Sequence, residues 1–424
     1  MKKLIKFFKT LKTLKIYSKY DSKLHKGVVF GRPWVPLSFS ARFFPFWFGR
    51  YNYNNIILQA KGISVNENIK ISHDGIFNFT RYLEKKLLQK IATILNLSFS
   101  PFSGYITSGG TEANIYAMWI AREWAKAKNK VLKNSKTYWI IANNSHYSIN
   151  KAINLLDINC NFNNEIIEIE TDSIGSANYK KIIEHIQNIR NKGNDPIILP
   201  LTVMTTECGS IDPVREINNF ISESKIDNIF FHIDAAFSGF LLPFLDEYKD
   251  IFSLNSLSSI SVDFSKTIGG PVGSGAIILK AGLEENIVIH APYLLGNSDQ
   301  TLAGSRKGAD VIAMYSLLLV NSDFDIKQDI LNTIEKTQFL SKEMYAMDFI
   351  KLLYKPTLNY IIFYFVSIDK DRENKMRKIL SSYSVSSSMV KIENVDKELF
   401  KIILRKDHSY KNIKKLINDL KLTY

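Results

Sequence analysis

Cysteine is almost absent from this chain of 424 residues, which contains only Cys160 and Cys208. Two cysteines cannot form the disulfide framework that stabilises small secreted domains, so we expect a reducing compartment, the cytoplasm. Neither cysteine has neighbours in the spacing typical of a zinc site, and no metal is expected. The sequence favours a small buried thiol for Cys208.

Long apolar runs are also missing. No segment reaches the roughly 18 apolar residues that a transmembrane helix needs. The first twenty residues, MKKLIKFFKTLKTLKIYSKY, contain seven lysines among leucine, isoleucine and phenylalanine. They have neither the unbroken apolar core nor the cleavage pattern of a signal peptide. Their near-helical spacing leaves open a helix that lies on a membrane surface.

Acidic residues are fewer than basic ones, 41 against 55, which gives a formal net charge of +14. Beyond the first twenty residues the lysines are spread rather than clustered, so a nucleic-acid partner is not expected. The hydrophobic share of 46% and the charged share of 23% are ordinary for a globular protein. A chain of this length exceeds one hydrophobic core, so two structural domains are expected.

Lys266 has unusual surroundings for a charged residue. It follows a short strand-like segment and precedes a glycine-rich turn, in the run ISVDFSKTIGGP. Apolar and small residues flank it on both sides. Lysines in such surroundings lose their proton readily and become amine nucleophiles toward aldehydes. The pattern therefore predicts a covalent anchor for a carbonyl compound.

A phosphate site is predicted at residues 105–114, YITSGGTEAN. The paired glycines Gly109 and Gly110 let backbone amides approach an anion closely, and Thr111 can cap the following helix with its hydroxyl. The partial positive charge of a helix amino terminus also favours a phosphate there. An ordinary glycine loop with a capping threonine is the alternative.

His146 follows the apolar strand predicted over residues 138–142. It therefore lies at the carboxyl end of a strand, where open α/β sheets bind ligands. Its flat ring can stack on an aromatic cofactor. A helix-capping region with an incidental histidine is the alternative.

Asp234 ends a near-continuous apolar run, NIFFHID, which is typical of a buried parallel strand. A buried acid must find a partner or become neutral. A protonated ring nitrogen is such a partner, and this pairing keeps a pyridoxal phosphate (PLP) ring an electron sink. The alternative is that Asp234 caps the next loop. His232 shares the sheet face of Asp234, without an assigned role.

Two further segments supply polar groups. Thr206 follows the apolar strand predicted over residues 196–201 and offers a hydroxyl beside the ring. Ser305 and Arg306, in the segment DQTLAGSRKG, are available to an anion. The lysine, the phosphate cradle, the histidine and the acid together predict a PLP site.

The ordered motifs SGGTEAN, SHYSINKA, TTECGSIDP, HIDAAFSG, SVDFSK and DQTLAGSRKG resemble the group II PLP-dependent decarboxylases, in their histidine and serine decarboxylase-like branch. The resemblance covers about residues 65–320. It implies the type I aminotransferase-like fold, a homodimer with active sites at the interface, and removal of the α-carboxylate of an amino acid. In such a dimer the basic first twenty residues are interpreted as an arm that packs on the partner.

The resemblance also implies roles for individual residues. Lys266 forms the Schiff base, Asp234 pairs with the pyridine nitrogen, and His146 stacks on the ring. The residues implied to bind the cofactor through its phosphate or beside its ring are Gly110, Thr111, Thr206 and Ser305, the last from the same subunit or from across the dimer interface.

Two positions are less determined. Tyr293 is a candidate for the acid that protonates Cα, with a packed tyrosine as the alternative. The family usually has histidine immediately before the lysine, whereas this chain has Ser265. A serine can still donate to a phosphate oxygen, so cofactor binding is expected to survive, while proton handling and substrate preference are left open.

Alternatives to a decarboxylase remain at this point. Another type I PLP enzyme, an aminotransferase or a carbon–carbon or carbon–sulfur lyase, needs the same lysine, aspartate and phosphate cradle. A non-catalytic relative is disfavoured because Lys266 and Asp234 are both present. The substrate stays open among histidine, serine, aspartate, glutamate and the aromatic amino acids.

The pattern of segments predicts an α/β fold. Strands and helices alternate over residues 105–279, which favours a mostly parallel, doubly wound sheet. An amphipathic helix over 74–97 precedes it, and a helix from 309 leads to a smaller α+β domain. There we expect strands over 358–366 and 399–405 and helices over 372–380 and 410–420. The predicted division is an arm over 1–65, a large PLP-binding domain over 66–310 and a small domain over 311–424.

Overall fold

The computed structural model divides the described chain into two compact units. The larger comprises Trp34–Ile330 with Val390–Asp396, and the smaller comprises Met1–Pro33, Leu331–Met389 and Lys397–Tyr424. The predicted boundaries at 65 and 310 stay a prediction. The structure describes residues 30, 38–48, 54–55, 76–132, 136–160, 163–292, 298–304, 306–366, 368–385 and 387–422.

A seven-stranded sheet forms the centre of the larger unit, in the order β2-β8-β7-β6-β5-β3-β4. Strands β4, β3, β5, β6 and β7 run parallel, whereas β8 is antiparallel to both β7 and β2. The mostly parallel doubly wound sheet is therefore confirmed. The strands are β2 (Phe102–Thr107), β3 (Thr137–Ala142), β4 (Asn164–Ile169), β5 (Ile197–Thr202), β6 (Ile229–Asp234), β7 (Leu257–Asp263) and β8 (Gly275–Lys280).

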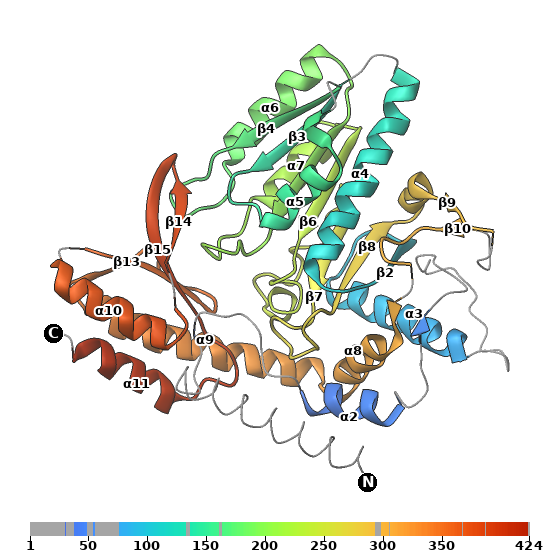
Figure 1. Ribbon diagram of the computed structural model, residues 1–424. Coiled ribbons are helices and arrows are strands. Elements are labelled where there is room, and N and C mark those ends of the chain that lie inside the picture. Colours follow the sequence, from blue (N-terminus) through green and yellow to red (C-terminus); the bar gives the residue numbers. More distant parts are fainter. Residues whose placement is uncertain are drawn as a thin grey trace, which may run out of the picture. The chain divides into compact units, whose positions relative to one another are not determined.

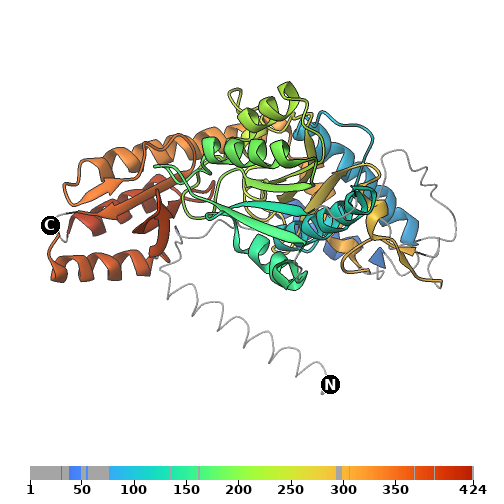
Figure 2. The same cartoon turned by 90° about the horizontal axis from the view of Figure 1, so that it is seen from above.

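Helices cover both faces of this sheet. Helices α4 (Gly110–Leu132) and α5 (Tyr147–Leu155) lie on one side, and α6 (Tyr179–Lys192) and α7 (Val214–Glu223) lie on the other, as Figures 1 and 2 show. Because burial on both faces removes the need for alternation, strands β3 and β5 are apolar along nearly their whole length.

Alternation still decides which side chains meet α4. Phe230 of β6 packs in the same buried cluster as Tyr116 and Ala117 of α4. His232 and Asp234 lie two and four residues further along the strand, so they point to the same face. This register brings the acid at the end of β6 under the amino-terminal turn of α4.

The larger unit contains three more described helices, α2, α3 and α8. Helix α3 (Ile76–Ile94) matches the predicted amphipathic helix, α2 (Phe39–Phe48) packs on α8, and α8 (Gly308–Val320) begins at the predicted place. Short strands pair at β1 (Asn54–Asn55) with β11 (Arg306–Lys307), and at β9 (Ile289–His290) with β10 (Ser298–Asp299).

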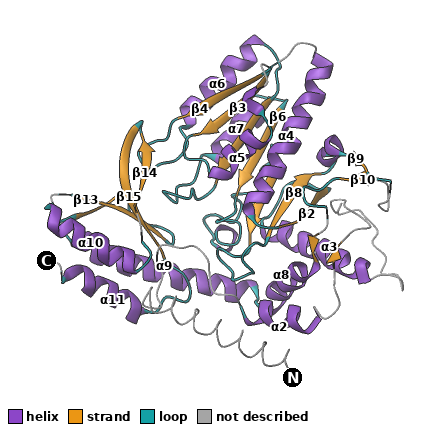
Figure 3. Cartoon of the chain, in the orientation of Figure 1, coloured by secondary structure: helices purple, strands orange, loops and turns teal. Residues whose placement is uncertain are grey.

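The smaller unit has a four-stranded antiparallel sheet in the order β12-β13-β15-β14, with helices α10 and α11 beside it (Figure 3). Apolar side chains of this sheet, including Ile361 and Phe363, form one core with Leu380 and Leu416 of the helices. The elements of this part of the chain are α9 (Asp323–Tyr345), β12 (Ile350–Leu352), β13 (Tyr360–Phe365), α10 (Lys370–Ser382), β14 (Ser387–Ile392), β15 (Val395–Ile403) and α11 (Tyr410–Lys421). Of these, residues 323–330 of α9 and Val390–Asp396 of the β14–β15 hairpin belong to the larger unit. The strands and helices of the predicted small α+β domain are thus present.

Within the described ranges, no helix is both long enough and apolar enough to cross a membrane. Among those same residues, no three His, Cys, Asp or Glu side chains gather as metal ligands would.

Candidate active site

The predicted lysine, histidine and aspartate come from three strands of the central sheet. Asp234 ends β6 and lies in register with Ser261 of the neighbouring strand β7. Lys266 is half-buried and lies three residues beyond the end of β7, while His146 follows the end of β3. Lys266 and His146 both interact electrostatically with Asp234, so the three groups lie together at the carboxyl ends of these strands.

Asp234 is 4% exposed and ionised. One carboxylate oxygen accepts the backbone N–H of Ala236 at 3.0 Å, and the other accepts the side-chain N–H of Asn114 at 2.7 Å. Burial alone would raise the pKa of Asp234, but the fields of His146 and Lys266 and the hydrogen bond from Ala236 outweigh it and lower that pKa. A buried carboxylate that keeps its charge is a ready partner for a cation.

His146 is the N-cap residue of α5. Its Nδ1 atom accepts the backbone N–H of Ser148 at 3.3 Å and lies 2.7 Å from the Ser148 hydroxyl. The ring centroid lies 4.3 Å from that of Tyr147. Burial lowers the pKa of His146, the charge of Asp234 opposes this, and the charge of Lys266 lowers it further. The capping role that the sequence left as an alternative is therefore present, and its hydrogen bonds engage Nδ1 at the edge of the ring rather than a ring face.

The predicted phosphate cradle sits at the start of α4. Gly109 has φ +116°, a left-handed conformation that favours glycine, and a Cβ on Gly110 would lie 2.8 Å from the Cβ of Ala236. Glu112 secures the turn, since its carboxylate accepts the backbone N–H of Ser108 at 2.7 Å and the Tyr105 hydroxyl at 3.0 Å. The amino-terminal turn of the helix is thus held against the strand that carries Asp234.

Thr111 lies half-buried in this first turn, and its hydroxyl is 3.4 Å from the Tyr147 hydroxyl. The contact joins the cradle to the histidine-bearing end of β3. The backbone N–H of Gly110 donates to Asp263 at 3.2 Å, so this amide already has an acceptor. Thr111 also lies in the first turn of the helix, where backbone N–H groups have no acceptor within the helix itself and can donate to a phosphate.

Ser265 is buried, and its single hydroxyl proton is donated to Asp263 at 2.6 Å, while its backbone N–H donates to the same oxygen at 2.9 Å. The hydroxyl therefore orients the turn before Lys266. We predict that Ser265→Ala weakens PLP retention by about 1 kcal/mol, the size of one neutral hydrogen bond. PLP dissociation constants of the two proteins measure this; a thousandfold collapse would show that Ser265 is a principal anchor instead.

Thr206 lies half-buried in the turn after β5. That turn is fixed by the hydroxyls of Thr205 and Ser210, 2.7 Å apart, and by Asp212, which accepts the backbone N–H of Thr202 at 2.7 Å. Burial raises the pKa of Asp212 to about 6 despite these hydrogen bonds. The segment is a rigid support on which Thr206 is presented.

Tyr293 and Ser305 lie outside the described residues. Arg306, next to Ser305, is described and is held inside the protein. It forms an ion pair of 2.9 Å with Glu84, and its guanidinium lies 4.8 Å from the centre of the Tyr105 ring. Arg306 is therefore tied to Glu84 of α3 and to Tyr105 of β2, the strand that leads into the phosphate cradle.

Sequence reasoning missed the residues that support the site from below. Asn114, in the SGGTEAN motif, is completely buried and hydrogen-bonds to Asp234. Asp263 joins Gly110 to Ser265. The sequence did contain a signal for Asn114. It lies on the otherwise apolar, buried face of its helix, and a buried polar side chain needs hydrogen-bonding partners.

The residues fit the cofactor that the sequence predicts. A charged carboxylate lies buried where a ring nitrogen would bind. The absence of a Cβ on Gly110 lets the helix start lie against Ala236, two residues after that carboxylate. The hydroxyls of Thr267 and Ser145, which neighbour Lys266 and His146 in the chain, are buried without a partner among the described residues. Orphaned donors of this kind suit a polar ligand.

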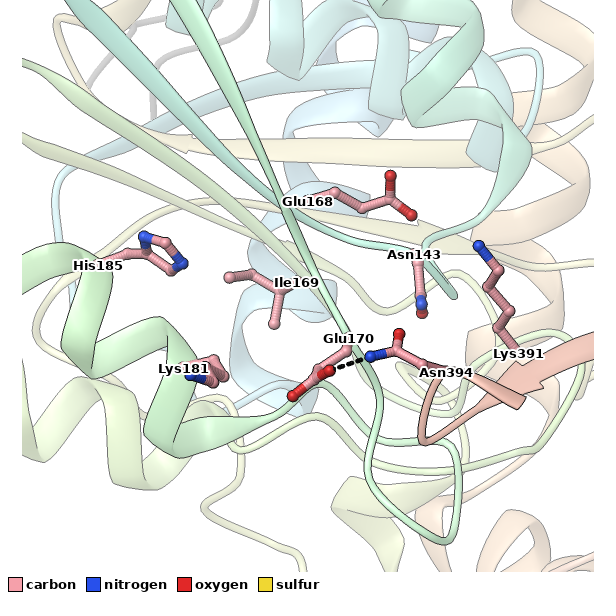
Figure 4. Close-up of a pocket in the computed structure, with 8 residues that line it drawn as sticks. All are labelled: Asn143, Glu168, Ile169, Glu170, Lys181, His185, Lys391 and Asn394. Carbon is pink, nitrogen blue, oxygen red and sulfur yellow. Dashed lines mark hydrogen bonds between the residues drawn. The ribbon is translucent and has the colours of Figure 1, made fainter. Parts of the chain in front are cut away.

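A separate cavity of about 400 Å³ lies at the β4 edge of the sheet, and Figure 4 shows its side chains. Two of the side chains that line it are joined, since Asn394 donates a hydrogen bond to Glu170. It contains none of the predicted site residues. Its lining consists of Asn143, Glu168, Ile169, Glu170, Lys181, His185, Lys391 and Asn394.

His232 predicts a pH dependence of stability. It is fully buried, and burial lowers its pKa to about 4 from an ordinary value of 6.5. Between about pH 4 and pH 6.5, His232 is therefore protonated in the unfolded chain but not in the folded protein. The stabilisation is complete above pH 6.5 and is lost as the pH falls through 4, by up to about 3 kcal/mol.

Urea unfolding between pH 7 and pH 4 measures this effect. His232→Gln removes the titrating group and is expected to flatten the dependence, whatever its stability at pH 7. His290→Gln, at an exposed position, is the control and is expected to keep the parent's slope. An unchanged slope in His232→Gln would assign the acid sensitivity to other groups.

Comparison with known proteins adds a family match. Residues 68–366 match the pyridoxal-dependent decarboxylase conserved domain. A probable L-tyrosine/L-aspartate decarboxylase of Methanococcus aeolicus is 33% identical over 298 residues, which cover 68% of this chain and 72% of the relative. The tryptophan decarboxylase of Clostridium sporogenes is 28% identical over 82% of this chain and 80% of its own. The histidine decarboxylase of Acinetobacter baumannii is 30% identical over 60% and 62%.

The fold also has solved counterparts. The L-methionine decarboxylase of Streptomyces sp. 590 superposes with a TM-score of 0.75 and 17% sequence identity, covering 97% of this chain and 94% of that one. At this identity the likeness concerns the fold, which is the type I fold that the motifs implied.

Proposed function

This chain belongs to the pyridoxal-dependent decarboxylase family, and from that premise we propose how its residues divide the work and which amino acids it accepts. It is a PLP-dependent carboxy-lyase that releases the α-carboxylate of an amino acid as carbon dioxide. The observation that carries the assignment is the buried, ionised carboxylate of Asp234 at the end of β6, within the electrostatic reach of Lys266 and His146.

Lys266 would hold the cofactor covalently through its side-chain amine, since an unprotonated lysine is a nucleophile toward aldehydes. PLP when bound withdraws the electron pair that the departing carboxylate leaves on Cα. The lysine's position beyond β7, in a half-buried turn that Asp263 and Ser265 hold rigid, supports this role. A rigid turn keeps the amine at one place while substrate and product exchange.

Asp234 holds a proton on the pyridine nitrogen. Its two oxygens are oriented by Ala236 and Asn114, so the carboxylate cannot rotate away without losing hydrogen bonds. His146 packs its ring against the cofactor plane and thereby restricts its tilt. The first turn of α4 and Thr111 bind the phosphate through N–H and hydroxyl donors, and Gly110 lets this turn lie close to Ala236.

Thr206, Tyr293 and Ser305 complete the proposed set. Thr206 lies beside the ring on the turn after β5, and Ser305 donates to the phosphate from a second copy of the chain. Tyr293 delivers the proton from its phenol oxygen to Cα after carbon dioxide has left. The assignments of Thr206 and Ser305 rest on the family motifs, and that of Tyr293 rests on its place just before the segment DQTLAGSRKG.

The substrate proposed is an L-amino acid with a flat ring, namely tyrosine, tryptophan or histidine. Relatives whose names include tyrosine, tryptophan or histidine match this chain at 28–33% identity, and the relative named for tyrosine is named for aspartate as well. A screen of the twenty amino acids for carbon dioxide and amine product tests the proposal, with Lys266→Ala as the background control. We expect ring-bearing substrates to exceed glutamate and serine by at least about tenfold in kcat/KM, or about 1.4 kcal/mol. A preference for an acidic or hydroxyl side chain would refute the proposed class.

A homodimer with active sites at the interface is also proposed. Large apolar side chains are exposed on α2 and around the junction of α8 and α9, with Phe39 at 78%, Phe324 at 68% and Leu319 at 61% exposure. Helices α2 and α8 pack together, as Figure 1 shows, so these groups belong to one region of the larger unit. Sedimentation at micromolar concentration would give twice the mass of 48.6 kDa, whereas a monomer would refute the dimer.

A cytoplasmic location is the last part of the proposal. The chain has only two cysteines, Cys160 and Cys208, and such low cysteine content without a disulfide framework is typical of reducing compartments. Cell fractionation with an antibody to the chain would place the activity in the soluble or the membrane fraction, and the second result would favour the membrane-surface alternative for the basic first twenty residues.

A further inference from the structure

A closed hydrogen-bond network lies directly beneath the proposed cofactor site, with Asn114 at its centre. This amide is fully buried on the second turn of α4 and makes four hydrogen bonds. Its partners come from three other elements, β6, β7 and α5. The four contacts are Asp234 Oδ2 at 2.7 Å, Ser148 Oγ at 2.9 Å, Ser261 Oγ at 2.6 Å and His232 Nε2 at 3.1 Å.

The orientation of the Asn114 amide follows from its partners. An ionised Asp234 can only accept, so the amide nitrogen of Asn114 must face it. The second N–H of that nitrogen donates to Ser148. The amide oxygen in turn accepts from Ser261 and from His232 Nε2. A flipped amide would set its oxygen 2.7 Å from a carboxylate oxygen, so the orientation is unique.

A backbone donor determines the proton on His146. The backbone N–H of Ser148 donates to His146 Nδ1 at 3.3 Å, so Nδ1 carries no proton and the ring proton sits on Nε2. With Nδ1 as an acceptor, the Ser148 hydroxyl, 2.7 Å away, donates its proton to that nitrogen and accepts the hydrogen bond from Asn114.

We propose that Asn114 and Ser148 are positioning residues that couple Asp234 to His146 and hold the His146 ring neutral in its Nε2–H tautomer. A neutral ring can lie flat against an electron-deficient cofactor without the repulsion that an imidazolium would meet. The inference rests on the proposed function for the roles of Asp234 and His146, but the network itself belongs to the protein.

The charges around His146 act in both directions. Asp234, Glu207 and Asp263 favour its protonated form, and Lys266 disfavours it. Burial lowers the pKa of His146 overall. Since three carboxylates favour protonation, the two donors on Nδ1 are a specific device that opposes it, beyond what burial provides.

The alternative is that these polar groups only satisfy one another within the core. The two explanations differ in what happens when Ser148 alone is changed. A network that merely fills space would leave the histidine's protonation state unaltered, whereas a positioning network would release it. Asn114→Ala removes four hydrogen bonds at once and is expected to be unstable, so Ser148→Ala carries the test.

The experiment reads the ring nitrogens of His146 by NMR in holoenzyme labelled with ¹⁵N-histidine, assigned with His146→Gln. The parent is expected to show one tautomer, protonated on Nε2, at pH 7. In Ser148→Ala the titration midpoint of His146 is expected to rise by about one pH unit, the equivalent of one neutral hydrogen bond, and the second tautomer is expected to appear. Ser148→Thr keeps a hydroxyl and is expected to restore the parent's behaviour.

Asn150→Ala, at an exposed position on the same helix, is the matched control and is expected to leave the ring unchanged. A His146 ring that keeps its tautomer and midpoint in Ser148→Ala would overturn the inference. The proposed function fails by a different result, covalent PLP in Lys266→Ala. The ¹⁵N shifts of His146 would decide the network's role even then.

Discussion

Lys266→Ala is expected to lose covalent PLP and to reduce turnover by on the order of 10⁴-fold or more, the scale typical of removing a covalent nucleophile. The lysine lies three residues past the end of β7 and has no second lysine beside it in the chain. A side chain without an amine cannot form the bond to the aldehyde. Borohydride reduction followed by peptide mass spectrometry measures the attachment directly.

Lys280→Ala is the matched control, because Lys280 ends the neighbouring strand β8 and is exposed. It is expected to keep both the modified peptide and the activity. If Lys266→Ala still yielded a PLP-modified peptide after reduction, the anchor would be another lysine. Circular dichroism of both variants would exclude unfolding as the cause of lost activity.

Asp234→Asn is expected to slow decarboxylation by several orders of magnitude, because an ion pair to a ring that must stay protonated contributes several kcal/mol to the transition state. The structure adds a second effect. Both oxygens of Asp234 accept hydrogen bonds, from Ala236 and Asn114. An amide nitrogen at either place would oppose a donor, so stability is expected to fall by about 1–3 kcal/mol as well.

Single-turnover rates at saturating PLP, together with urea unfolding, separate the two effects. A variant that is fully loaded and folded but slow would support the electron-sink role. Activity within about tenfold of the parent, roughly 1.4 kcal/mol, would mean that Asp234 acts only as a structural cap, the alternative that the sequence left open.

Local sequence signals were sufficient for the elements that are buried on both faces. Strands β3, β5 and β6 are near-continuous apolar runs, because parallel strands in a covered sheet need no polar face. The predicted helix over residues 372–380 is α10, which begins with Asp369 as its N-cap, accepting the backbone N–H of Arg372. A run of apolar residues or a capping side chain is a local property.

Edge strands were not predicted in this way. β4 and β14 are partly exposed along most of their length, with glutamate, serine and lysine among their residues. They are strands because β3 and β15 offer them hydrogen-bonding partners. Their own residues do not show the alternation or the apolar run that would predict a strand. Pairing between distant segments depends on the arrangement of the whole sheet.

The sequence by itself determined which chemistry this protein carries: a lysine in an apolar turn, an acid closing a buried strand, a histidine after another, and a glycine pair before a helix. Each signal needs only a few neighbouring residues, since burial and helix starts leave local patterns. Together they predicted a PLP site, and the resemblance of the ordered motifs to the group II decarboxylases predicted the reaction.

Only the tertiary structure decided how those groups are held. Asn114 reaches Asp234 across 120 residues of chain and Ser261 across 147, and the Ser265 proton is donated to Asp263 rather than left for a phosphate. Strand order and register choose such partners, and both arise from packing the complete sheet against α4. A hydrogen bond needs its two atoms within about 3 Å, a condition that sequence separation does not reveal.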